Sequence, residues 1–397
     1  MKRVALGDVC DIVGGGTPSR SVEAYFSGQI PWATVRDMNC DWIEKTDLRI
    51  TPEAIANSST KIIPANSVVI ATRVGLGKVC RLSADTAINQ DLRGILPKAT
   101  SQLDNGYLFW WLRSQADKII AAGTGATVQG VKLPFVKSLQ LPLPPLAEQR
   151  RIVATLNEAF AGIATAISNA EKNLANAREI PSAVFANSSD KNSHAVRLGD
   201  FVTRLTNGYV GPTRNIYVDT GIPYLLAKHV KDDVLSFDGK TFVTQEFNEK
   251  NKKSKLLEGD VLLVQSGHIG HSSVVPPHHA GHNCHAMIVM TTKPALSGHY
   301  LSGYLNSLQG RRATQAIRSG STVPHLTCRE VRELRIPLPC IEAQQSCVVA
   351  YQQAIERSQY LIGSYETKLR NLAELKQSLL AKAFSGELAF ADQAVAA

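Results

Sequence analysis

The stretch that decides the fold is LPLPPLAEQRRIV, residues 141–153, which joins a proline-rich segment to a long alanine-rich run. Proline ends a preceding element and is tolerated in the first turn of a helix, so a helix is expected to begin near Leu146. Apolar residues then recur at steps of three and four, which is a coiled-coil seam with one stutter near Ile163. If it ran to about Ala186, this helix would be roughly 60 Å long, more than one compact core needs. The seam comprises Ile152, Leu156, Ala159, Ile163, Ile167, Ala170, Leu174 and Ala177.

The same proline-to-helix pattern returns as IPLPCIEAQ at residues 336–344. A second seam of matching length follows it, with Lys376 as one gap. Two such seams in one chain most simply bury each other, so we predict two long antiparallel helices that form an intramolecular coiled coil. Two separate core helices are the alternative, which the repeated proline-flanked motif disfavours. The second seam comprises Val348, Tyr351, Ile355, Ser358, Ile362, Tyr365, Leu369, Leu372 and Leu379.

The segments before the two helices also repeat one another. The matched motifs are LGD at 6–8 and 198–200, IPW at 30–32 and IPY at 222–224, and SVVI at 67–70 and DVLL at 260–263. The polar residues between these matched positions do not repeat. The chain therefore reads as two tandem copies of an α+β body (mixed α/β) followed by a long helix, and divergent polar fillings suit two recognition modules with two targets.

Composition sets the broad class. The chain has 397 residues, enough for two or more domains, and 44% of them are hydrophobic, as in a globular protein. A net charge of +9 favours a polyanionic partner, although many basic proteins bind no nucleic acid. Seven cysteines without paired spacing indicate a reducing compartment. The sequence shows no signal peptide and no apolar run of about 20 residues, so a cytoplasmic protein without a membrane span is expected.

These features together resemble the specificity subunit of type I restriction–modification systems, over nearly the whole chain. The motifs that carry the resemblance are GGGTPS at 14–19, IPW at 30–32, the run 142–153 and LLAKAFSGEL at 379–388. The second copy departs from the pattern, because Cys340 replaces a proline, the arginine pair is missing and no full GGGTPS follows Gly208. The implied domains are target-recognition domains at 1–145 and 188–340, long helices at 146–187 and 341–386, and a tail at 387–397.

The resemblance implies a chain that binds double-stranded DNA at a bipartite asymmetric site and directs adenine-N6 methylation or restriction by partner subunits. Two methyltransferase subunits would bind S-adenosylmethionine and extrude the target adenine, and restriction/translocase subunits would use ATP and Mg, so no cofactor is expected on this chain. Paired helices that act as a ruler would place the half-site centres about 10 bp apart, or modestly more. The candidate partner-binding residues are Glu148, Gln149, Arg150, Arg151, Glu342 and Gln344.

Two alternatives to this interpretation remain open. One is a similar subunit of a methylation-only or fused-nuclease system. The other is a coiled-coil adaptor that binds protein rather than DNA.

Candidate DNA contacts are the polar residues that fill the space between matched scaffold positions. Arg suits guanine and Asn or Gln suits adenine in the major groove, whereas cations that touch only phosphate position the protein without reading sequence. For each candidate, a structural or solvent role is the alternative. In the first domain the candidates are Thr34, Arg36, Asp37, Thr72, Arg73, Asn89, Gln90, Thr124 and Thr127. In the second domain they are Lys228, His229, Gln265, Ser266, His268, Asn283, Ser321 and Thr322.

No motif indicates catalysis. GLGK at 75–78 lacks the first glycine and the final hydroxyl residue of a phosphate-binding loop. The histidines between 268 and 285 are interpreted as a solvated or DNA-facing loop rather than a metal site, because Pro276, Pro277 and Gly281 argue against helical ligand spacing. The sequence therefore predicts recognition and assembly, without catalysis and without a metal.

Overall fold

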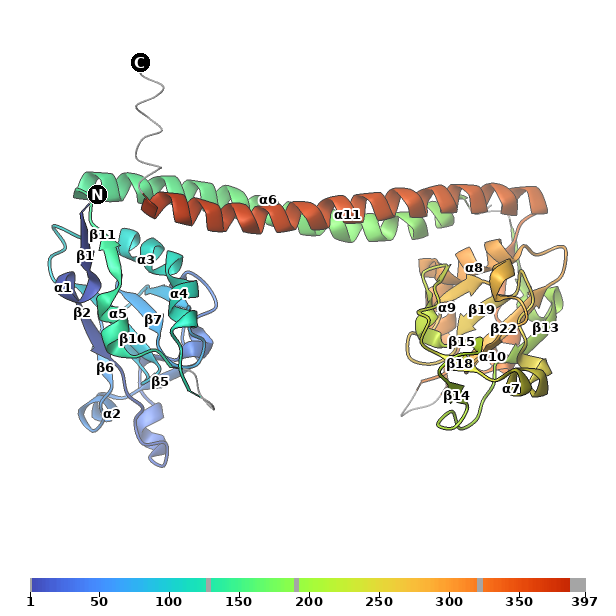
Figure 1. The fold of residues 1–397 in the computed structure, drawn as a ribbon, viewed down its shortest axis with the longest axis horizontal. Coiled ribbons are helices and arrows are strands. Elements are labelled where there is room, and N and C mark those ends of the chain that lie inside the picture. The colour runs from blue at the N-terminus through green and yellow to red at the C-terminus, as the bar shows by residue number, and fades with distance from the viewer. Residues whose placement is uncertain (1, 126–129, 189–192, 320–323, 386–397) are drawn as a thin grey trace, which may run out of the picture. The chain divides into compact units, whose positions relative to one another are not determined.

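A computed structural model describes residues 2–125, 130–188, 193–319 and 324–385. The protein divides into two compact units, Met1–Asn169 with Lys368–Ala397 and Ala170–Thr367. Each unit contains a globular body of strands and short helices, together with parts of both long helices (Figure 1). The compact units therefore do not coincide with the sequence repeats, because the division passes through both long helices.

The body of the first unit is built on a five-stranded sheet, in the order β2-β10-β7-β8-β4, and a four-stranded sheet, in the order β5-β3-β9-β6. Strands β3 and β9 run parallel, with Trp32 opposite Ala87, so both strands end at the same edge. The elements are β1 (Arg3–Ala5), α1 (Leu6–Val9), β2 (Cys10–Gly14), β3 (Ile30–Ala33), β4 (Trp42–Ile43), β5 (Leu48–Ile50), α2 (Pro52–Ala56), β6 (Lys61–Ile63), β7 (Val68–Ala71), β8 (Val79–Leu82), β9 (Thr86–Ile88), β10 (Leu92–Pro97), α3 (Asn105–Ser114), α4 (Ala116–Ala121), α5 (Leu133–Ser138), β11 (Gln140–Pro142) and α6 (Leu146–Ser188).

One core connects the sheet of this body to the long helix. Strand β7 is buried at all four residues, as its apolar run predicts. The Asp104 carboxylate accepts from the backbone N–H of Gly106 and Tyr107 and so caps α3, which lies between the sheet and α6 (Figure 1). Ile70 of β7, Trp111 of α3 and Leu156 of α6 share one hydrophobic cluster.

The body of the second unit repeats this plan with a sheet in the order β13-β22-β19-β20 and another in the order β14-β18-β15-β21. Strands β15 and β21 are its parallel pair, with Tyr224 opposite Asn283. The elements are β12 (His194–Arg197), β13 (Val202–Asn207), β14 (Tyr217–Val218), β15 (Ile222–Leu225), β16 (Val230–Lys231), β17 (Val234–Leu235), β18 (Phe242–Val243), α7 (Gln245–Lys250), β19 (Val261–Val264), β20 (Ser272–Val274), β21 (Asn283–Cys284), β22 (Met287–Thr292), α8 (Gly298–Asn306), α9 (Leu308–Ala316), α10 (Cys328–Glu333), β23 (Arg335–Leu338) and α11 (Ile341–Ser385).

The long helices α6, of 43 residues, and α11, of 45 residues, pair as the seams predict. In the first unit, the Lys376 ammonium near the end of α11 lies 5.2 Å from the ring centre of Phe160 in the first half of α6. In the second unit, Ser358 Oγ in the first half of α11 donates to the carbonyl of Ala177, late in α6, at 2.7 Å. Early residues of one helix thus contact late residues of the other in both units, which confirms the antiparallel pairing.

The end of each long helix completes the core of the body that belongs to the other sequence copy. Phe384 of α11 packs its ring 5.3 Å from that of Tyr107 in the first unit. Phe185 of α6 lies 5.3 Å from Tyr300 and 5.4 Å from Tyr351 in the second unit. Each phenylalanine is almost fully buried, so neither body has a complete core without the helix end that arrives from the other copy.

Candidate nucleic-acid interface

In the first unit, five of the predicted DNA contacts line one cavity of about 590 Å³. The cavity lies where the parallel strands β3 and β9 end, beside the 3₁₀ turn Val35–Asp37 and the glycine-rich segment that follows β2. Concave sites with convergent polar groups are where proteins usually bind ligands. The predicted residues brought together here are Thr34, Arg36, Asp37, Asn89 and Gln90.

Thr34 and Asp37 form a capping box that fixes the 3₁₀ turn. The Thr34 backbone N–H donates to Asp37 Oδ2 at 2.7 Å, and Thr34 Oγ1 accepts from the backbone N–H of Arg36 at 3.2 Å. The second carboxylate oxygen of Asp37 accepts from the backbone N–H of Asp47. These bonds occupy Thr34 and Asp37 within the protein and leave the exposed Arg36 side chain at the rim, where it can reach a base or a phosphate.

The floor of the cavity is organised around Asp91. Asn89 Nδ2 donates to Asp91 Oδ2 at 3.0 Å, and Arg73 Nε lies 3.7 Å from Asp91 Oδ1. Thr72 Oγ1 donates to the Asp91 carbonyl at 3.3 Å. Because Thr72 and Asn89 are buried, their position supports a structural role, whereas Arg73 and Gln90 are exposed.

The remaining first-domain candidates lie beside this floor. Thr124 forms an isolated bridge with Gly130, and Gly130 forms another with Arg73. Thr124 and Arg73 are both exposed, and Gly130 bridges to each of them. Thr127 lies outside the described residues.

In the second unit, Gln265 and Ser266 follow β19 as Thr72 and Arg73 follow β7. Ser266 bridges His325, which also bridges Ser319, and this reproduces the arrangement of Arg73, Gly130 and Thr124. His268 is exposed and lies edge-on to His271, with ring centres 5.9 Å apart. Ser321 and Thr322 lie outside the described residues.

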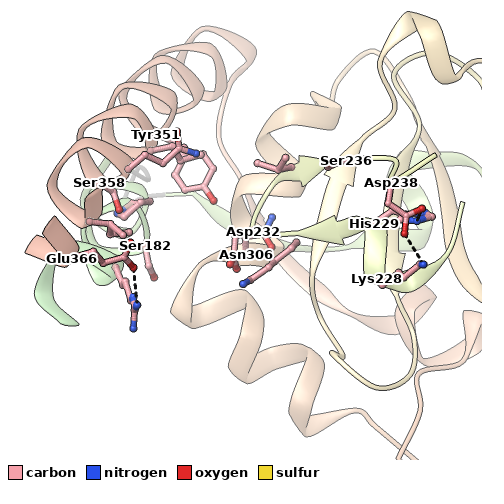
Figure 2. Close-up of a pocket in the computed structure, with 17 residues that line it drawn as sticks. Ser182, Lys228, His229, Asp232, Ser236, Asp238, Asn306, Tyr351, Ser358 and Glu366 are labelled. Atoms are coloured by element: carbon pink, nitrogen blue, oxygen red, sulfur yellow. Dashed lines mark hydrogen bonds and ion pairs between the residues drawn. The ribbon is translucent and has the colours of Figure 1, made fainter. Parts of the chain in front are cut away.

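Lys228 and His229 lie elsewhere, in a depression of about 960 Å³ between the strand pair β16–β17 and the long helices (Figure 2). Lys228 Nζ is 2.7 Å from Asp238 Oδ2, and His229 Nε2 lies 3.1 Å from Asp238 Oδ1. The Leu226 backbone N–H donates to His229 Nδ1, and burial lowers the pKa of His229 although Asp238 opposes the shift. The structure does not bring this pair together with Gln265, and it gives the enclosed His229 ring a structural role.

Asn283 is a misplaced prediction. It is fully buried, and its Nδ2 donates to Asn248 Oδ1 at 2.7 Å while its Oδ1 accepts from Ser254. The strand register places Asn283 opposite Tyr224, as Ala87 lies opposite Trp32, so Asn283 is not the counterpart of Asn89.

The true counterpart of Asn89 is His285, which the sequence comparison missed. The His285 backbone N–H donates to the Leu225 carbonyl at 2.8 Å, as that of Asn89 donates to Ala33 at 3.0 Å. The near-constant offset between the copies selected Asn283 because it matched the residue type. Strand pairing is set by backbone hydrogen bonds instead. The sequence did carry one signal, because Asn89 and His285 are each the first residue after the matching strand, β9 or β21.

Two predicted partner-binding residues are also corrected, because Gln149 and Gln344 are fully buried. Gln149 Nε2 donates to the carbonyls of Gln102 and Pro144 at 2.8 and 2.9 Å, and Gln149 Oε1 accepts from the Asp104 backbone N–H at 2.9 Å. Gln344 repeats the arrangement with Ala295, Pro339 and Ser297. Each glutamine therefore ties the start of a long helix to the loop before α3 or α8.

The other residues at the helix starts differ in exposure. Arg151 forms a paired contact with Glu148, with Nε 2.8 Å from Oε2, and this hydrogen bond lowers the pKa of Glu148. Arg150 and Glu342 are exposed, and they remain the most accessible partner-binding candidates.

No group of three or more His, Cys, Asp or Glu side chains that could hold a metal occurs among the described residues. His279 Nδ1 and His282 Nδ1 lie 3.2 Å apart, and burial lowers the pKa of both rings. Over the same part of the chain, no helix has the length and apolar character needed to cross a membrane.

Comparison with known proteins gives consistent matches over the chain. The family model described as type I restriction modification DNA specificity domain matches residues 1–176 and 190–358. The type I restriction enzyme MjaIX specificity subunit of Methanocaldococcus jannaschii is 24% identical over 412 residues, covering 96% of this chain and 92% of that protein. The EcoR124I/EcoR124II specificity subunit of Escherichia coli is 33% identical over 160 residues, but that match spans only 39% of its length and 38% of this chain.

Two solved structures share the fold. A chain from work on complex assembly and conformational transition of the type I R-M system aligns with a TM-score of 0.76 at 20% identity, covering 97% of this chain and 98% of that one. The HsdS subunit from Thermoanaerobacter tengcongensis aligns with a TM-score of 0.61 at 18% identity, covering 97% of each chain.

Proposed function

The chain belongs to the family of type I restriction–modification DNA specificity domains, and we propose that each of its two globular bodies reads one half of a bipartite, asymmetric DNA site. The observation that carries this proposal is that the two bodies share the same strand arrangement but place different side chains at the equivalent strand ends. Trp32 and Asn89 stand at the ends of β3 and β9 in the first unit, where Tyr224 and His285 stand in the second. A shared scaffold with different polar groups suits two modules that read different bases.

In the first unit, the candidates for reading or positioning DNA are the exposed residues Arg36, Arg73, Gln90 and Thr124. An arginine can contact guanine O6 and N7 together, and a glutamine can contact adenine N6 and N7. The carboxylates of Asp37 and Asp91 are already engaged by the protein, which limits their repulsion of DNA phosphates.

The chain acts by recognition, and its partner subunits supply the chemistry. Two methyltransferase subunits would bind S-adenosylmethionine and methylate adenine at N6, and restriction/translocase subunits would use ATP and Mg. The two helix starts offer repeated docking surfaces, and Arg150 and Glu342 are the exposed residues through which two copies of one partner could dock. Native mass spectrometry of the co-expressed complex should give two methyltransferase subunits per chain, and a one-to-one ratio would count against this stoichiometry.

The test of the half-site proposal exchanges residues 196–335 for the matching segment of a relative and maps methylated sites in the host by sequencing. One half of the motif should change and the other should stay the same. If both halves change together, the two bodies do not read separately. A salt titration of DNA binding distinguishes this proposal from the alternative of an adaptor that binds protein rather than DNA. Release of counterions from phosphates makes the affinity of a DNA-binding protein for DNA fall steeply with salt.

A further inference from the structure

The second unit contains three buried polar atoms that have no hydrogen-bond partner within the described ranges: Tyr224 Oη, Gln265 Oε1 and His285 Nδ1. The rings of Tyr224 and His285 lie 6.3 Å apart. Gln265 directly follows β19, whose last residue Val264 pairs with Met287, so the backbone of Gln265 comes opposite Ala286, the residue after His285. Because a buried polar atom without a partner is costly, each of these atoms is a candidate for contact with a ligand.

The corresponding positions of the first unit are all satisfied internally. Trp32 Nε1 donates to the Gly16 carbonyl at 3.2 Å, and Asn89 Nδ2 donates to Asp91 at 3.0 Å. Thr72 Oγ1 donates to the Asp91 carbonyl at 3.3 Å. Thr72 corresponds to Gln265, because their carbonyls accept from the matching backbone N–H groups of Val131 and Leu326.

The difference arises from one missing residue. Gln90 and Asp91 separate Asn89 from Leu92, whereas Ala286 alone separates His285 from Met287, and Ala286 adopts a positive φ of 46°. The carboxylate that organises the first floor therefore has no counterpart in the second unit. The lost internal partner leaves Gln265 Oε1 available to an external group, and the His285 ring lies near the Tyr209 backbone, whose hydrogen bond opposes the lowering of its pKa by burial.

We propose that Gln265, with help from His285, recognises a base in the second half-site by contacting the exocyclic amino group of that base in the major groove. This inference rests on the proposed function. The unpartnered Gln265 Oε1 can only accept a hydrogen bond, so it selects the amino groups of adenine and cytosine over the oxygens of thymine and guanine. Adenine fits best, because the Gln265 amide N–H can donate to its N7 at the same time.

The surroundings suit this role. Gln265 and His285 are half-buried, so rotation of either side chain presents its polar atom without unfolding the strand ends. Tyr209 and Phe247, whose rings lie 5.0 Å apart, form an aromatic wall next to His285. Tyr224 is fully buried, and its ring lies edge-on to that of Phe247 with ring centres 5.9 Å apart.

The test is Gln265→Leu in the chain co-expressed with its methyltransferase subunits, with methylated sites mapped by sequencing. One position of the second half-site should lose its preference, with methylation of the original motif slowed about tenfold or more, and the first half-site should be unchanged. Because Gln265 Oε1 has no internal partner, the thermal midpoint should not fall. His285→Asn, which installs the residue of the first copy, should relax the same or an adjacent position.

Gln245→Leu is the matched control, because Gln245 is an exposed glutamine of the same unit whose amide bonds Glu249, and its motif should equal that of the wild type. An unaltered motif and rate in both Gln265→Leu and His285→Asn would overturn the inference, as would a lowered thermal midpoint with an intact motif. If the wild-type complex itself showed no sequence preference, the proposed function would fail instead, so the two failures are distinguishable.

Discussion

Replacing Gln149 by leucine should loosen the junction between the first long helix and its body. Leucine has a similar size but cannot make the three hydrogen bonds of the Gln149 amide, at 2.8, 2.9 and 2.9 Å. The change would leave the Asp104 backbone N–H and the carbonyls of Gln102 and Pro144 buried without these hydrogen-bond partners. At about 1 kcal/mol for each lost bond, the free energy of unfolding should fall by about 3 kcal/mol.

Gln344→Leu should have the same effect in the second unit, where the equivalent bonds measure 2.8, 2.9 and 3.0 Å. Since the two glutamines lie in different compact units and share no partner, the losses in the double variant should add to within about 0.5 kcal/mol. Gln345→Leu is the matched control, because Gln345 is the next residue on α11 and is exposed.

Urea unfolding of the purified full chain measures the loss, and hydrogen exchange should become faster at residues 102–107 for Gln149→Leu and at 295–300 for Gln344→Leu. A loss of less than about 0.5 kcal/mol, or one equal to that of Gln345→Leu, would refute the reasoning that these amides anchor the helices.

Other predictions concern acid, packing and helix length. Burial lowers the pKa of His279 from 6.5 to about 4, so its contribution to stability is present above pH 6.5 and is lost as the pH falls towards 4. Between these two pH values, urea unfolding should show a loss of stability about 1–2 kcal/mol larger in the wild type than in His279→Gln, and an equal loss in both would contradict this. Phe384→Ala should lower the free energy of unfolding by about 3 kcal/mol by emptying the space beside Tyr107, and an unchanged urea midpoint would contradict this. Tyr224→Phe, which removes an unpartnered hydroxyl, should raise the free energy of unfolding by about 1 kcal/mol, and a decrease would indicate that the hydroxyl has an internal partner. Four residues inserted after Ala170 lengthen a helix by about 6 Å and nearly restore its facing direction, so the methylated motif should keep its half-sites and gain one base pair of gap, or two at most; an active variant with an unaltered gap would rule out a ruler.

The scaffold could be predicted because its signals are periodic. Ile152, Leu156 and Ile163 fall on one stripe of α6, and their burial follows from that spacing alone. The prolines before Leu146 and Ile341 mark the helix starts for the same local reason, since a proline limits what can precede it.

The polar residues could not be assigned in this way, because their roles depend on partners distant in the sequence. Gln149 and Arg150 are adjacent, yet one is enclosed by backbone groups of residues 102–104 and the other faces solvent. The counterpart of Asn89 is likewise His285, two positions beyond Asn283, and only strand register reveals it. The spacing of residues in the sequence predicts on which face of a helix or strand a side chain lies, whereas its role depends on the hydrogen-bond partners that the fold brings to it.

The packing of Phe384 against Tyr107 has a consequence for the order in which the protein matures during synthesis. The second unit is contiguous, Ala170–Thr367, but the first needs both its early residues and those after Lys368. Tyr107, Ile152 and Leu156 therefore leave the ribosome long before the turns that carry Leu379 and Phe384. The body that is translated first is the last to close its core, and it must hold an open apolar face for most of translation, which is when a nascent chain of this kind is most exposed to chaperones and to aggregation.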